Sequence, residues 1–200
     1  MAEEYGRAEW RKDTGAAQAE AMRRVAVAAA TGADTLDFSD LVAMTALPSG
    51  LSDLPLLRQL FAGVRRPVRG ITDFSGHQLA DISALDQAHN LTLLNLTRTD
   101  VTDLTALSGL TGLTTLNLSH TPVTDLSGLL QIPRFADETA LGLRISGTPA
   151  ADPKTNTPLS GLSNLPPKDC AIAVVRYLKG LTPDQPSPTL AQALAGASPI

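Results

Sequence analysis

The sequence predicts an α/β repeat fold, a right-handed solenoid in which every coil adds one short strand to a parallel sheet. Two observations support this prediction. The segment 91–107 recurs as the segment 113–129, with apolar residues at the same places in both copies. Hydrophobic residues make up 43% of the chain but aromatic residues only 4%, so small aliphatic side chains must fill the interior. Stacked coils that bury their apolar sides only against neighbouring coils are typically built this way.

The first copy shows how one coil is expected to fold. Leu94 and Leu96 are two residues apart, so their side chains point to the same side of a strand. The chain must then turn back, and Asp103 is suited to capping a short helical turn at that point. Leu104 and Leu107 follow three residues apart and can face the same interior. The corresponding apolar residues of the second copy are Leu113, Leu116, Leu118, Val123, Leu126 and Leu129.

Weaker copies extend the repeats over residues 33–165, which gives about five coils. A slightly longer coil precedes the two clear copies and another one follows them. The stretch from Leu60 to Leu94 is too long for one such coil and too short for two. Although the segment 71–75 looks like another copy of Val-Thr-Asp-Leu-Ser, we expect one long coil with an insertion near residues 64–74.

Helices are expected to cover the apolar ends of this solenoid. An N-terminal capping helix is expected over residues 17–32, where Gly32 is a natural stop. Its apolar face comprises Met22, Val25, Ala26 and Ala29, with Glu20, Arg23 and Arg24 elsewhere. A C-terminal capping helix is expected over residues 166–180. Its apolar stripe comprises Ala171, Val174, Val175 and Leu178. Residues 1–16 and 181–200 are expected to be flexible.

Composition and motifs favour binding over catalysis. The net charge is −4, from 16 basic and 20 acidic residues, whereas nucleic-acid binders usually have a basic surplus, so no nucleic-acid partner is expected. The histidines are scattered and no phosphate-binding loop is present, so we expect no catalytic residue, no cofactor and no metal site. Cys170, the only cysteine, is expected to be a small packing residue. Asp81, Asp103 and Asp125 recur at the same place in successive copies and are expected to cap helical turns rather than to form paired acids or a cation site.

Features of the sequence also predict a cytoplasmic location. The sequence has no basic start followed by an apolar run and no long uninterrupted apolar stretch, so neither a secretory signal nor a membrane span is expected. A single cysteine fits a reducing compartment. The densest basic stretch, residues 64–69, could meet an acidic partner or a phosphate, although such a run is more often a solvated loop.

At residues 91–129 the pattern resembles the bacterial leucine-rich repeats with 22-residue coils that are found in internalins. The resemblance spans roughly residues 17–180. It implies a leucine-rich-repeat right-handed solenoid, a short horseshoe arc with a parallel concave sheet, N- and C-terminal helical caps and protein recognition on the concave side. Thr99, Thr121 and Thr148 depart from the usual pattern, because this class normally has Asn after the strand and Thr belongs to a variant of it. The coils are few, so the binding face is limited.

Between the inward leucines, the remaining strand residues are expected to face solvent on the concave side. The candidate partner-binding face comprises Phe61, Leu93, Asn95, Thr97, Arg98, Thr115, Asn117, Ser119, His120 and Arg144, with Gly63, Gly142 and Ser146 in the same register. Arg98 and His120 lie at the strand edge. This face could be a polar recognition strip with Phe61 and Leu93 as apolar anchors, or it could be an ordinary solvated sheet face.

The resemblance therefore predicts a non-catalytic protein–protein interaction scaffold that binds its partner through the concave face. Two other functions stay open at this point. The chain could be the sensor or substrate-recognition arm of a larger multidomain signalling or effector enzyme. It could also be a surface-exposed adhesion module, which the missing secretory signal disfavours.

Overall fold

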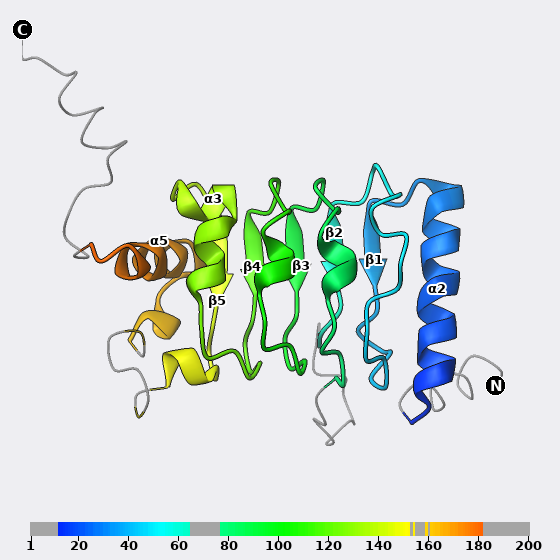
Figure 1. The fold of residues 1–200 in the computed structure, drawn as a ribbon, viewed down its shortest axis with the longest axis horizontal. Coiled ribbons are helices and arrows are strands. Elements are labelled where there is room, and N and C mark those ends of the chain that lie inside the picture. Colours follow the sequence, from blue (N-terminus) through cyan, green and yellow to red (C-terminus); the bar gives the residue numbers. More distant parts are fainter. Residues whose placement is uncertain (1–11, 65–76, 153, 155–158, 160, 182–200) are drawn as a thin grey trace, which may run out of the picture.

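In the computed structural model, five short strands form one parallel sheet in chain order. The model describes residues 12–64, 77–152, 154, 159 and 161–181. The strands are β1 (Thr35–Asp37), β2 (Gln59–Phe61), β3 (Leu93–Asn95), β4 (Thr115–Asn117) and β5 (Gly142–Arg144). Each pairs in parallel with the next strand along the chain, so every connection makes one full turn. The result is a row of stacked coils with a helix at each end (Figure 1).

Sheet register defines where each coil begins and ends. Leu94 lies opposite Leu116, its equivalent in the second clear copy, and Leu116 lies opposite Leu143. Leu60 lies opposite Leu94, so the whole stretch between them forms a single connection. Residues 65–76, which hold most of the expected insertion and of the basic stretch, lie outside the described residues.

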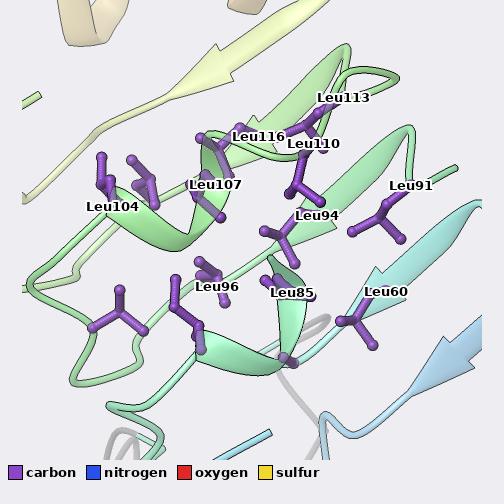
Figure 2. Packing of buried hydrophobic residues seen from close by; sticks show 14 of the residues in the cluster. Leu60, Leu85, Leu91, Leu94, Leu96, Leu104, Leu107, Leu110, Leu113 and Leu116 are labelled. Atoms are coloured by element: carbon purple, nitrogen blue, oxygen red, sulfur yellow. The ribbon is translucent and has the colours of Figure 1, made fainter. Parts of the chain in front are cut away.

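The middle residue of every strand points into the core. Leu94 and Leu116 are both 0% exposed and lie side by side in the register of β3 and β4 (Figure 2). The predicted inward stacking of these two leucines is thereby confirmed. The other apolar residues of the two clear copies that the sequence predicted to face inward are buried as well, among them Leu96, Val101, Leu104, Leu107, Leu118, Val123, Leu126 and Leu129. Full burial of one such side chain is worth about 1.5–3 kcal/mol.

Threonine replaces asparagine in this solenoid without leaving a polar group unsatisfied. Thr99, Thr121 and Thr148 are 1%, 2% and 1% exposed. Their hydroxyls donate hydrogen bonds of 2.8, 2.7 and 2.8 Å to the carbonyl three residues earlier, in Leu96, Leu118 and Ile145. Because a buried hydroxyl without a partner would be costly, this local bond explains how the variant residue fits the interior.

Short 3-10 helices return the chain after the strands, and the recurring aspartates begin three of them. The helices are η1 (Ser83–Leu85), η2 (Thr105–Leu107) and η3 (Ser127–Gln131). The carboxylates of Asp81, Asp103 and Asp125 accept the backbone N–H two residues later, at 2.9, 2.8 and 2.7 Å. These hydrogen bonds lower the pKa of the Asp81 and Asp125 carboxyls. The pKa of Asp103 is lowered first by the hydroxyl of Thr105 and then by the backbone N–H of the same residue. As predicted, the aspartates bind the start of these turns, but from one residue before the N-cap positions Ile82, Leu104 and Leu126.

The N-terminal helix, α2 (Thr14–Thr31), starts three residues before the predicted boundary, inside the segment expected to be flexible. Asp13 explains the earlier start, because its carboxylate accepts the N–H of Ala16 at 2.8 Å. Gly32 ends the helix in the left-handed conformation with φ 67°. Of the predicted apolar face only Val25 is buried: Met22 is 55% exposed, and Ala26 and Ala29 are exposed as well. The buried residues of α2 are Ala17, Glu20, Ala21, Val25 and Ala28.

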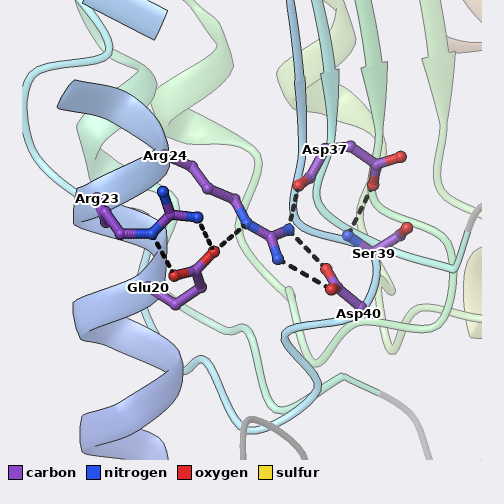
Figure 3. A network of polar contacts seen from close by, with 6 residues as sticks. All are labelled: Glu20, Arg23, Arg24, Asp37, Ser39 and Asp40. Atoms are coloured by element: carbon purple, nitrogen blue, oxygen red, sulfur yellow. Dashed lines mark hydrogen bonds and ion pairs between the residues drawn. The ribbon is translucent and has the colours of Figure 1, made fainter. Parts of the chain in front are cut away.

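An arginine network explains the different orientation of α2 (Figure 3). Arg24 reaches across to the first coil, where its guanidinium donates to the carboxylate of Asp40 at 2.6 and 2.9 Å and to the carbonyl of Asp37 at 2.6 Å. It also donates to Glu20 at 2.9 Å, and Arg23 binds the same carboxylate at 2.7 Å. Hydrogen bonds from Arg23 and then Arg24 lower the pKa of Glu20 to about 2, although the burial of this carboxylate acts to raise it. The burial of Glu20 beside the apolar residues of this face is therefore compensated by paired charges.

Replacing Arg24 by methionine is expected to lower the free energy of unfolding by about 1–3 kcal/mol, because the part-buried Asp40 carboxylate loses its charged partner. Chemical denaturation with urea measures the change. Arg23→Met is the matched control on the same helix: the Arg23 side chain is 64% exposed and Glu20 keeps Arg24, so a loss below about 1 kcal/mol is expected. Equal losses in the two variants would show that the network does not hold α2 in place.

The C-terminal helix, α5 (Pro167–Leu178), packs on β5 at the other end of the sheet. Its buried residues are Cys170, Ala171, Val174 and Val175. The apolar stripe in the sequence predicted the burial of the last three. Leu178 is partly buried against the same core. A short helix, α3 (Pro133–Ala136), lies in the coil between β4 and β5, and Glu138 just after it binds Arg176 of α5 at 3.0 Å. Within the described part of the chain, no helix combines the length and apolar character that crossing a bilayer needs.

Candidate partner-binding face

Opposite the core, the sheet has an outward side that we call the strand face. It consists of the first and third residue of each strand together with the second residue beyond each of the last three strands, Thr97, Ser119 and Ser146. Parallel register places equivalent side chains in rows across the sheet. The row of third residues runs Asp37, Phe61, Asn95, Asn117 and Arg144. Most of the sequence-predicted site residues are thereby brought onto one surface.

Exposure along this face is uneven. Arg144 is exposed, and seven other candidates are partly exposed. The partly exposed candidates are Phe61, Leu93, Thr97, Arg98, Thr115, Asn117 and Ser119. His120 is exposed at the strand edge, as predicted. Among the candidates, Asn95 is the exception, at 8% exposed.

Asn95 was expected to face solvent and does not. Its Nδ2 donates to the carbonyl of Val64 at 3.3 Å, so the chain leaving β2 covers it. Two glycines of the same register are also covered. Gly142 lies under Pro167 of α5: a β-carbon on residue 142 would come within 3.1 Å of the Pro167 side chain. Gly63 lies against the backbone of Thr97. The open part of the strand face is therefore smaller than the sequence predicted.

Asparagine side chains on this face also serve the turns. The Oδ1 atoms of Asn95 and Asn117 accept the backbone N–H two residues later, at 2.9 and 3.0 Å. Asp37 does the same in β1, where it accepts from Ser39 at 2.9 Å. This structural role was missed from the sequence, although the spacing of Asn or Asp two residues before Ser or Thr could have revealed it.

Four side chains on β4 and β5 or just beyond their ends have hydrogen-bond donors that face solvent. We call them the donor corner: Asn117, Ser119, Arg144 and Ser146. The carboxamide of Asn117 uses its oxygen in the turn, so its amino group is left as the donor. Within the described part of the chain, the hydroxyls of Ser119 and Ser146 and the guanidinium of Arg144 make no hydrogen bond or ion pair. The sequence predicted Asn117, Ser119 and Arg144 as site residues. Ser146 was named only as a residue in the same register.

Left-handed backbone marks the edge where three successive strands end. Arg98, His120 and Gly147 occupy equivalent positions, with φ of 58°, 59° and 70°. The imidazole of His120 lies over Gly147, where a β-carbon would overlap it. A shallow cavity of about 400 Å³ follows this edge. Asp100 lines this cavity together with Arg98 and His120, so the cavity has both acidic and basic side chains on its walls.

Reactive chemistry is not concentrated on the strand face. Among the residues of the five strands, Asp37 and Arg144 are the only charged ones, and they lie on opposite edge strands. The described residues include no group of three or more His, Cys, Asp or Glu side chains that could hold a metal ion. Cys170 is 1% exposed, and burial raises the pKa of its thiol to about 11, so it is protonated at neutral pH. The arrangement is suited to contact and hydrogen bonding.

Stacked coils decide the architecture: each has a buried leucine at the centre of a three-residue strand, and a short turn helix follows every strand from β2 onward. The chain has the fold of a leucine-rich-repeat solenoid. Its sequence matches no protein-family model and no curated protein.

Among solved structures, two proteins of Listeria monocytogenes are similar to the leucine-rich-repeat chain. The first is internalin C2 of strain 4b F2365, with 23% identity and a TM-score of 0.38, covering 64% of this chain and 50% of that one. The second is the functional domain of InlJ, described as including a cysteine ladder, with 16% identity and a TM-score of 0.31, covering 58% of this chain and 33% of that one. This chain thus spans half or less of the length of either protein.

Proposed function

We propose that this chain is a non-catalytic scaffold that binds another protein through the strand face, the concave side of the leucine-rich repeats. The observation that carries the proposal is the partial exposure of Phe61 and Leu93 on neighbouring strands. Gln59 pairs with Leu93, and Phe61 follows two residues later, so the two apolar side chains are diagonal neighbours. That diagonal is within the reach of an aromatic side chain, so the pair can offer one apolar surface to a partner.

Most residues around this apolar pair are polar but uncharged, and Asp37, directly opposite Phe61 in β1, is the charged exception. Depletion of charge at the centre is typical of protein-binding surfaces. Thr115 lies directly opposite Leu93, while Thr97, Asn117 and Ser119 lie further along the same face, and all four are partly exposed. A surface of that kind can exclude water at its centre and form hydrogen bonds at its rim. The rigid sheet beneath it limits the entropy lost on binding.

Charge and cysteine content guide the choice of partner and compartment. With a net charge of −4, the chain repels nucleic acid and anionic membrane surfaces more than it attracts them, so the partner we propose is a protein. The single cysteine is buried and cannot pair within the chain, which favours work in the reducing cytoplasm.

Leu93→Glu tests the strand face directly. Proteins retained by the immobilised full chain from an extract of its own cells are compared between the natural sequence and this variant. A charge placed in the centre of the binding surface is expected to reduce retention of the specific partner at least tenfold, about 1.4 kcal/mol. Thr102→Glu, on the opposite side of the same coil, adds the same charge at an exposed site and is expected to retain the partner. Retention that both variants keep, or that both lose, contradicts binding through the strand face.

A further inference from the structure

We propose that the donor corner of the strand face binds a carboxylate, supplied by an Asp or Glu side chain of the partner. The inference rests on the proposed function, because it names the chemistry by which that partner would be recognised. Its four members offer donors of three kinds: the guanidinium of Arg144, the amino group of Asn117 and the hydroxyls of Ser119 and Ser146. Guanidinium and carboxylate groups form paired, charge-assisted hydrogen bonds, and neutral donors beside them add to the selectivity.

The register brings these donors together. Asn117 and Arg144 are directly opposite each other in β4 and β5. The ladder continues past the strand ends, because the backbone N–H of His120 donates to the carbonyl of Ser146 at 2.7 Å. Ser119 and Ser146 therefore follow the first pair on the same side of the sheet, two residues further on. Neighbouring strands are about 4.8 Å apart, so the four side chains border an area that one carboxylate can span.

Asn117 differs from its counterpart Asn95 in having an available amino group. Both use Oδ1 to accept the N–H two residues later, which orients the carboxamide and leaves Nδ2 as the donor. In Asn95 that donor is already bound to the carbonyl of Val64, and the residue is 8% exposed. In Asn117 no described residue accepts it and the side chain is partly exposed. The site is therefore confined to β4 and β5.

Electrostatics favour an anion here. Among residues of the five strands, the only carboxylate belongs to Asp37 in β1, four strand spacings or about 19 Å away. Asp169 of α5 is exposed, and within the described part of the chain it forms no ion pair with Arg144. Among the described residues, Arg144 is consequently a cation without a compensating charge at hydrogen-bond distance. A single guanidinium among neutral donors suits the one negative charge of a carboxylate, whereas a polyanion would meet the negative net charge of the chain.

Binding can be measured before the partner is known, with acetyl-(Glu)₄-amide as the probe and acetyl-(Gln)₄-amide as its uncharged match. Two-dimensional NMR of the ¹⁵N-labelled full chain reports on the site through the side-chain signals of Arg144 and Asn117 and the amide signals of Ser119 and Ser146. We expect the glutamate peptide to shift these signals together and saturably. The glutamine peptide is expected to leave them in place, and added salt to weaken the shift.

Two variants separate this site from general charge attraction. Arg144→Gln removes the cation, and Asn117→Asp replaces the amino donor by an anion while keeping the turn, as Asp37 does in β1. Each is expected to weaken binding of the glutamate peptide at least about tenfold. Arg134→Gln removes one exposed positive charge from α3 and is expected to leave binding unchanged.

Three results would overturn the inference: donor-corner signals that do not move, equal shifts with the glutamine peptide, or equal weakening by Arg134→Gln. The proposed function is judged separately, through partner retention by Leu93→Glu. A partner that needs Leu93 while the glutamate peptide leaves the donor corner unaffected would remove this inference and keep the scaffold. Peptide binding at the donor corner without partner loss in Leu93→Glu would contradict the proposed function but keep the carboxylate site.

Discussion

Leu116→Ala is expected to lower the free energy of unfolding by about 3–5 kcal/mol. Leu116 is 0% exposed and lies between Leu94 and Leu143 in the middle of the stack. Removing its branched end loses the transfer free energy of the buried methyl groups and leaves a cavity that the two neighbouring coils cannot close without moving. A loss of this size is a large fraction of the stability of a domain with 200 residues.

Denaturation followed by circular dichroism measures the loss, and Thr115→Ala is the matched control. Thr115 precedes Leu116 in the same strand but is only partly buried on the opposite face, so a loss within about 0.5–1 kcal/mol is expected. Because each coil contacts only its neighbours, a cavity between coils can also separate the transition into two steps. A loss below about 1 kcal/mol for Leu116→Ala would mean that the coils do not depend on this inward stacking.

Gly63→Ala is expected to lower the free energy of unfolding by roughly 3 kcal/mol or to prevent folding. A β-carbon at this position would overlap backbone atoms of Leu96 and Thr97 in the next coil. The Gly63 N–H donates to the carbonyl of Asn95 at 2.9 Å, so the two backbones cannot separate without losing a hydrogen bond. Overpacking against backbone is costly because no side-chain rotation relieves it.

Thermal denaturation compares this variant with Gly161→Ala. A β-carbon at Gly161 would meet no atom within 4 Å, and the φ of this residue is −69°. Gly161→Ala is therefore expected to change the free energy of unfolding by less than about 1 kcal/mol. A melting temperature of Gly63→Ala equal to that of the unaltered chain would show that the coil carrying β2 does not approach the next coil as closely as described.

Several features of the fold were predictable because they depend on spacing along the chain. The two-residue spacing of Leu94 and Leu96 determines which side of a strand they share, whatever lies beyond it. Asp103 caps a turn that begins two residues later, a contact that its own neighbours complete. The apolar stripe of α5 was also found, since Val174 and Val175 face the end of the solenoid without a competing polar contact.

For the candidate site, spacing predicted the side of the sheet but not the exposure. Asn95 and Asn117 occur in nearly identical segments, Asn-Leu-Thr and Asn-Leu-Ser, and both bind their own turn. They differ because the chain after β2 passes over the first and not over the second. Gly142 was likewise expected to be open and lies under Pro167, which belongs to the C-terminal helix rather than to the coil of β5.

By itself the sequence determined the repeat, the inward leucines and the capped turns, since each follows from residues that are neighbours in one coil. Tertiary structure alone decided which face α2 buries and which donors of the strand face stay open. The physical reason is that these outcomes depend on contacts between distant segments. The apolar stripe of Ala17, Ala21, Val25 and Ala28 faces the core where Arg24 can reach Asp40, and the position of the Val64 carbonyl separated two otherwise equivalent asparagines.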